Sequence, residues 1–127
     1  MRIASLVGGR LVEKLTPTDV DAQNSTLTVA QIAGGLVVHT STTGGGTVTT
    51  DTAANIIKGS GGIGKLKHNG ASISVRYIND GDQTLTLQAG DGVTVADTGQ
   101  TIATNESALL VFRRVSATAV VCYVIGA

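Results

Sequence analysis

The fold is decided by residues 72–95, which read SISVRYINDGDQTLTLQAGDGVTV. Apolar side chains alternate with polar ones in two short runs, at residues 72–77 and 84–87. A period of two is typical of a strand with one buried and one exposed face. The Asp80-Gly81 pair between the two runs favours a primed turn, so this stretch predicts a β-hairpin.

The remainder of the chain has the composition of a β protein. It contains 18 Thr, 15 Val and 9 Ile among 127 residues, so one residue in three is β-branched. Such residues favour strands over helices. Short apolar runs separated by Gly, Asp and Thr predict further strands, at residues 36–40, 47–50, 93–95, 107–115 and 119–125.

Two short helices interrupt these strands. Thr28 and Gln31 have the spacing of a capping box, and two glycines end that segment at residue 35. A second helix is predicted over residues 51–58, with Asp51 as its cap and Gly59 at its end. We therefore expect an all-β fold, a small β-sandwich or barrel-like domain with one or two short helices.

The last two predicted strands are apolar on both faces. Such a strand is central in its sheet or has its outer face covered. A helix or the N-terminal segment can cover part of this face, and a neighbouring subunit can cover the remainder. The residues that we expect at a subunit interface are Leu109, Val111, Val121 and Tyr123.

Residues 1–25 differ from the rest and are predicted to form an N-terminal arm, ahead of a β-rich domain at 26–127. The arm holds the only proline, Pro17, and its apolar residues follow no regular period. Its apolar run before Gly8 is too short for a signal peptide. We expect an arm of this composition to dock on its own domain or on a neighbouring subunit.

Charge and composition exclude several classes of function. Nine basic and nine acidic residues cancel, and aromatic residues make up 2% of the chain. A nucleic-acid binder usually has a basic surface or stacking aromatics, so we expect no nucleic-acid partner. No apolar stretch has the length of a membrane span, so we expect no membrane partner. Cys122 is the only cysteine and is compatible with a reducing compartment.

The glycine-rich stretch at residues 59–65, GSGGIGK, partly matches a phosphate-binding loop. Leu66 stands where such a loop needs Ser or Thr for magnesium, and a helix precedes the glycines instead of following them. A surface loop is the better interpretation. It is the most basic part of the sequence and could contact an acidic partner surface, through Lys58, Lys65, Lys67 and His68.

The chain lacks a recognisable catalytic or metal-binding set. His39 and Cys122 lie in apolar strands, which favours structural roles for both. The turn carboxylates Asp80, Asp82, Asp91 and Asp97 do not have the spacing of a calcium loop. We expect no enzyme activity, no cofactor and no metal.

Several segments resemble a known protein family when they are taken in order. They are TVAQIAGGL (28–36), TDTAANII (50–57), Tyr77-Ile78-Asn79, TLTLQAGDGVTV (84–95) and the stretch from Ile102 to Ile125, in which NESALLVFRRVSATAVVCY (105–123) matches best. The series is similar to capsid decoration proteins of tailed bacteriophages, also called head-stabilisation or cement proteins. The resemblance covers roughly residues 26–127, without the Gly/Lys loop at 58–70.

The resemblance implies a jelly-roll or β-tulip-like domain that assembles as a homotrimer. Such a protein is made in the host cytoplasm and placed on the outer surface of the virion capsid. There it would bind the major capsid protein at three-fold or quasi-three-fold sites. The resemblance does not cover the arm. From its apolar residues we expect the arm to reach a neighbouring subunit, with Arg2, Ile3, Leu6, Val7 and Leu11 as candidate capsid contacts.

Two alternatives remain open at this point. One is a tail-fibre, head-fibre or receptor-binding module, with residues 1–25 as the attachment segment. The other is a small enzyme or ligand-binding barrel, which a pocket pairing His39 or His68 with a carboxylate would favour.

Overall fold

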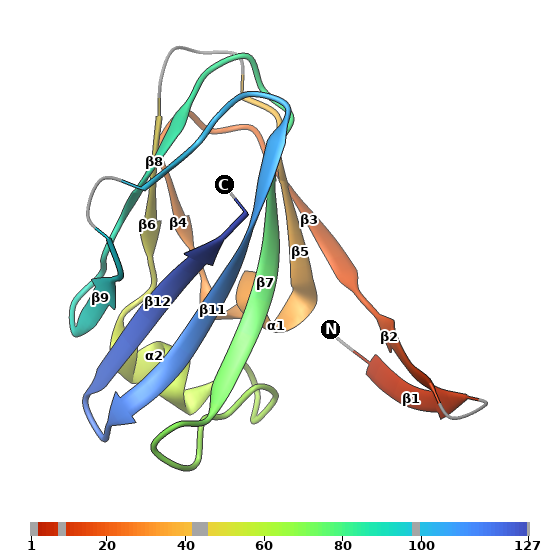
Figure 1. The fold of residues 1–127 in the computed structure, drawn as a ribbon, viewed down its shortest axis with the longest axis vertical. Coiled ribbons are helices and arrows are strands. Elements are labelled where there is room, and N and C mark those ends of the chain that lie inside the picture. Colours follow the sequence, from red (N-terminus) through yellow and green to blue (C-terminus); the bar gives the residue numbers. More distant parts are fainter. Residues whose placement is uncertain (1–2, 8–9, 42–45, 98–99, 127) are drawn as a thin grey trace.

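The computed structural model describes residues 3–7, 10–41, 46–97 and 100–126, with only the backbone described for 3–7 and 10–14. Most elements are strands of two larger sheets (Figure 1). The six-stranded sheet has the order β3 (Thr16–Val20), β5 (Gly35–His39), β7 (Ser72–Asn79), β11 (Glu106–Ser116), β12 (Ala119–Ile125) and β9 (Val93–Val95). The four-stranded sheet has the order β10 (Thr101–Ile102), β8 (Leu85–Gln88), β6 (Gly46–Thr50) and β4 (Ser25–Leu27).

From β3 to β11 successive strands alternate between the two sheets. Strands β3, β5 and β7 of one sheet, and β4, β6 and β8 of the other, are therefore each separated in sequence by one strand of the opposite sheet. The chain returns in the same direction each time, so β3, β5 and β7 pair in parallel, as do β4, β6 and β8. Parallel strands need a crossover connection, and here the facing sheet supplies it. Both sheets are mixed, because antiparallel pairs complete them.

The hairpin predicted at Asp80-Gly81 is wrong, because β7 and β8 belong to different sheets. The side chain of Asn79 stabilises the segment in which the chain passes from the six-stranded to the four-stranded sheet. Its Nδ2 donates to the carbonyl of Ile102 at 2.9 Å, and its Oδ1 accepts from the Gly81 N–H at 3.1 Å. A Cβ at position 81 would collide with the carbonyl of Ser41. Glycine is therefore required for this close passage.

The hairpin predicted near the C-terminus is confirmed. Strands β11 and β12 pair antiparallel, with Phe112 opposite Cys122 and Val111 opposite Tyr123. Strand β11 also pairs antiparallel with β7, which makes it central in its sheet.

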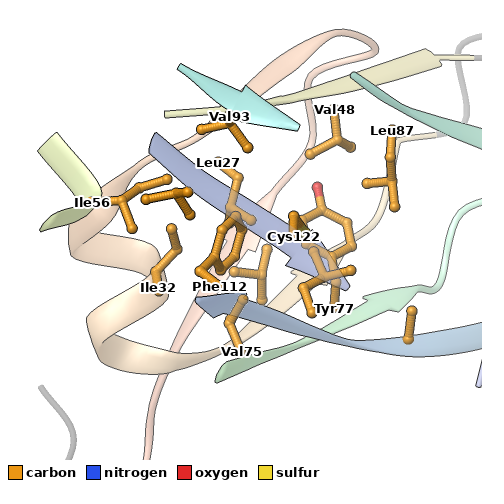
Figure 2. Close-up of a cluster of buried hydrophobic side chains, with 14 of the residues drawn as sticks. Leu27, Ile32, Val48, Ile56, Val75, Tyr77, Leu87, Val93, Phe112 and Cys122 are labelled. Atoms are coloured by element: carbon orange, nitrogen blue, oxygen red, sulfur yellow. The ribbon is translucent and has the colours of Figure 1, made fainter. Parts of the chain in front are cut away.

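One hydrophobic core lies between the two sheets (Figure 2). Val75, Tyr77, Phe112 and Cys122 of the six-stranded sheet are drawn together with Val48 and Leu87 of the four-stranded sheet. Most of the core is aliphatic, because Tyr77 and Phe112 are its only aromatic members. The molecule is mostly β with two short helices, as the composition predicts.

Both helices carry side-chain caps. Helix α1 (Val29–Gly34) has the predicted capping box, in which Thr28 and Gln31 bond to each other's backbone N–H groups. Helix α2 (Ala53–Lys58) is capped by Thr52 and not by Asp51. Asp51 instead accepts from the N–H groups of Val29 and Thr52, so it joins the starts of both helices.

The segment expected as an arm contains three strands. Strands β1 (Ile3–Val7) and β2 (Arg10–Lys14) pair antiparallel as a separate two-stranded sheet. In Figure 1 this hairpin projects away from the two larger sheets. Strand β3 differs, because it forms an edge of the six-stranded sheet beside β5.

Candidate functional site

The outer face of the six-stranded sheet carries all four residues expected at a subunit interface. In β11 the buried residues Ala108, Leu110 and Phe112 alternate with the half-buried Leu109 and Val111. Leu109 and Val111 therefore point away from the core.

Strand β12 continues this face. Val111 lies opposite Tyr123, and Leu109 lies opposite Ile125. Tyr123 is 39% exposed and Ile125 is 54% exposed. Val121, opposite Arg113, lies on the same side of the sheet and is half-buried.

The apolar character extends across β7 into β5. Ile78 lies opposite Ser107 of β11, and Val38 lies opposite Ile78. We call this surface the outer face and define it by Leu36, Val38, Ile78, Leu109, Val111, Val121, Tyr123 and Ile125. Arg76 is its central charged residue, and its guanidinium donates to the Ser107 hydroxyl at 3.4 Å. The sequence predicted the apolar residues of this face on β11 and β12. It did not predict the contributions of β5 and β7, because these depend on the order of the strands in the sheet.

The candidate capsid contacts of the arm are only partly described. Arg2 lies outside the described residues. Ile3, Leu6 and Val7 lie in β1 and Leu11 lies in β2, with Leu6 directly opposite Leu11. The structure thus brings four of these residues into one hairpin.

The basic loop is folded against the sheet. Gly61 and Gly62 form a tight turn, closed by hydrogen bonds between Ser60 and Ile63 at 2.9 and 3.0 Å. Leu66 is buried, and its N–H donates to the Ile57 carbonyl at 2.9 Å. The glycine-rich stretch therefore forms a turn and does not precede a helix.

Two arginines that the sequence did not connect with this loop lie beside it. The Arg114 guanidinium donates to the Leu66 carbonyl at 3.0 Å, and the Arg114 carbonyl accepts from the Gly70 N–H at 2.7 Å. Arg113, the preceding residue, is exposed. We call the group Lys58, Lys65, Lys67, His68, Arg113 and Arg114 the basic end.

Buried polar groups occupy one end of the core. The Nδ1 of His39 lies 3.0 Å from the Tyr77 hydroxyl, which also bonds with Ser25 of the opposite sheet. The Nε2 of His39 is buried with no partner among the described residues. Burial lowers the pKa of His39 and raises the pKa of Tyr77 to about 12.

The single thiol is also buried. Burial raises the pKa of Cys122 to about 12, so the thiol stays protonated at neutral pH. A protonated thiol is a poor nucleophile and a poor metal ligand.

A shallow hollow of about 390 Å³ lies at the start of α2. Its walls are small side chains and backbone, from Thr52, Ala53, Ala54, Asp91, Gly92, Ala117 and Thr118. Asp91 is its only ionisable lining residue. Neither histidine lines it, so it does not supply the histidine–carboxylate pair that an enzyme or ligand-binding barrel would need.

In the part of the chain that the structure describes, no three His, Cys, Asp or Glu side chains are grouped so that they could hold a metal ion. Neither described helix has the length and apolar character needed to span a membrane. Comparisons with protein-family models, with curated proteins and with solved structures give no match. The family resemblance therefore stays a prediction.

Proposed function

We propose that this chain is a structural virion protein that binds the outside of a tailed-phage capsid. It would stabilise contacts between major capsid protein subunits as a homotrimer at three-fold or quasi-three-fold sites. The observation that carries the proposal is the outer face, which gathers apolar side chains from four strands and includes the exposed Tyr123 and Ile125. On β7 it is interrupted by Ser74 and Arg76, so its apolar side chains are concentrated on β11 and β12. Apolar side chains gathered on an exposed face usually mark an interaction site.

We further infer that the two facing sheets form a β-sandwich, of the jelly-roll or β-tulip-like kind that the motif resemblance implies. A sandwich suits the role because one sheet face builds the core and the other is left for a partner. Trimer contacts through the outer face would leave the β1–β2 hairpin and the sheet ends for the capsid.

The hairpin gives each subunit a second contact. Among the residues that the structure describes, it pairs with no strand of the larger sheets, and its outer strand edges can add to an exposed sheet edge of a neighbour. A trimer would present three hairpins at once. Modest individual contacts would then combine into tight binding through effective concentration.

Copy number in purified virions tests the proposal. Quantitative mass spectrometry should give about one copy per major capsid protein, or one trimer per three-fold site, since decoration repeats with capsid symmetry. A few dozen copies or fewer would assign the chain to a fibre, vertex or tail. Absence from virions would overturn both structural roles.

Deletion of residues 2–15 tests the hairpin. Because β3 begins at Thr16, this deletion removes β1 and β2 and leaves the six-stranded sheet complete. We expect a folded protein with weakened capsid binding. Deletion of residues 2–20 is the matched comparison, since it also removes β3 and should lower stability. Unchanged capsid binding after deletion of 2–15 would contradict the role of the hairpin.

A further inference from the structure

The charges of this neutral chain are separated along the strands. Strand β7 ends at Asn79, beside His39 of β5 and Glu106 of β11. At that end lie the exposed carboxylates of Asp19, Asp21, Asp80, Asp82 and Glu106. The basic end lies at the opposite end of the same strands. Strand β7 begins there at Ser72, which lies opposite Arg113 of β11.

The cations of the basic end are held in place by the fold. Buried Leu66 separates two exposed lysines, Lys65 and Lys67. Both backbone groups of Leu66 are bonded, the N–H to Ile57 and the carbonyl to Arg114. The two ammonium groups are therefore presented on a fixed segment, and less conformational entropy is lost when they bind a partner.

These cations are not neutralised within the described chain. The structure shows no ion pair to Lys58, Lys65, Lys67 or Arg113 among the residues it describes. Asp51 lies at this end, but its carboxylate is occupied by backbone N–H groups and by Asn55. Asp91 lies at the start of α2, and no ion pair joins it to these cations in the described part of the chain. Cations that lie close together without counter-charges repel one another in the isolated protein. A bound acidic surface would relieve this repulsion, so the basic end is complementary to such a surface.

We propose that the basic end is a preformed docking surface for a carboxylate-rich protein surface, with Arg113 and Arg114 completing the loop cations. The acidic end would point away from that partner and oppose docking in the reverse direction. Nucleic acid fits less well, because Tyr77 and Phe112 are buried and Tyr123 lies on the outer face, so no Phe or Tyr ring lies at the basic end for stacking. The His68 imidazole is the aromatic ring there. This inference does not depend on the proposed capsid role.

A labelled ten-residue glutamate peptide is the probe, and fluorescence anisotropy at about 20 mM salt is the measurement, because screening is weak there. We expect the full chain to bind the peptide and to lose affinity as salt is added. Lys65→Gln with Lys67→Gln should weaken binding about five-fold, the effect of losing two exposed charge contacts.

The matched control places the same change of net charge at the acidic end. Gln83→Glu with Thr84→Glu alters two exposed residues there, and the two variants are compared at about 100 mM salt, where the Debye length is about 10 Å. The eight residues of β7 separate the two ends by roughly 25 Å, so the control should leave peptide affinity within about two-fold. Urea unfolding of both variants establishes that they fold.

Three results would overturn the inference. The first is that the glutamate peptide does not bind at low salt, or that the lysine variant and the control variant lose the same amount of peptide affinity. The second is tighter binding of a ten-nucleotide thymidine oligomer, lost on changing the lysines, which would assign a phosphate partner. The third is salt-sensitive self-association without peptide, lost on the same change, which would assign the acidic end of a second copy.

Discussion

At the scale of single residues, His39 makes stability depend on pH. The imidazole is buried, and burial lowers its pKa below the ordinary value of 6.5. The unfolded chain therefore binds a proton at a higher pH than the native chain does. The contribution of neutral His39 to stability is present above pH 6.5 and is lost as pH falls below it.

The free energy of unfolding should thus decrease between about pH 7.5 and 5.5, a range that brackets the ordinary histidine pKa. His39→Gln cannot titrate and should flatten this dependence. Urea unfolding at a series of pH values measures it, and His68→Gln in the exposed loop is the control that should keep the native slope. Equal slopes in the wild type and in His39→Gln would contradict the prediction.

Cys122 is a second residue whose chemistry is set by burial. With its pKa raised to about 12, the thiol should not react with Ellman's reagent at pH 8 in the folded protein. Unfolding in guanidinium should release one reactive thiol per chain. Rapid reaction in native buffer would mean that β12 separates readily from β11. That would contradict the prediction, because Cys122 is paired with Phe112 of β11 in the folded protein.

At the scale of elements, Asp51 connects the two helices. One carboxylate oxygen accepts from the Val29 N–H at 3.0 Å, and the other accepts from the Thr52 N–H at 2.8 Å. Asp51→Ala should therefore cost about 2 kcal/mol, against about 1 kcal/mol for loss of the single cap in Thr52→Ala. Urea midpoints of the two variants test this, and a smaller cost for Asp51→Ala would show that α1 does not depend on it.

Local elements were predictable where the deciding contacts are close in sequence. The capping box at Thr28 and the hairpin of β11 and β12 needed only neighbouring residues. The hairpin prediction at Asp80-Gly81 was wrong, because the residue types of a turn predict that the chain reverses but not which sheet the next strand joins. Arg114 was missed for a similar reason, since its bond to Leu66 spans 48 residues.

At the scale of the whole molecule, alternation of strands between sheets produces two surfaces of different character. Each strand of the six-stranded sheet has one side toward the core and one side outward. In β12, Cys122 lies in the core and the next residue, Tyr123, lies on the outer face. The same chemical change at these adjacent positions should therefore have different results.

Cys122→Asp would bury a charge and should cost more than about 4 kcal/mol, enough to unfold a marginally stable domain. Tyr123→Asp should leave the domain folded, because Tyr123 is 39% exposed in the single subunit. Its urea midpoint should fall only by the stability that subunit association supplies to the wild type. Sedimentation of the wild type should show a trimer and that of Tyr123→Asp a monomer, since a charge on an apolar interface opposes association. If both sediment alike, the outer face is not where subunits meet, and the interface must be sought at the sheet ends.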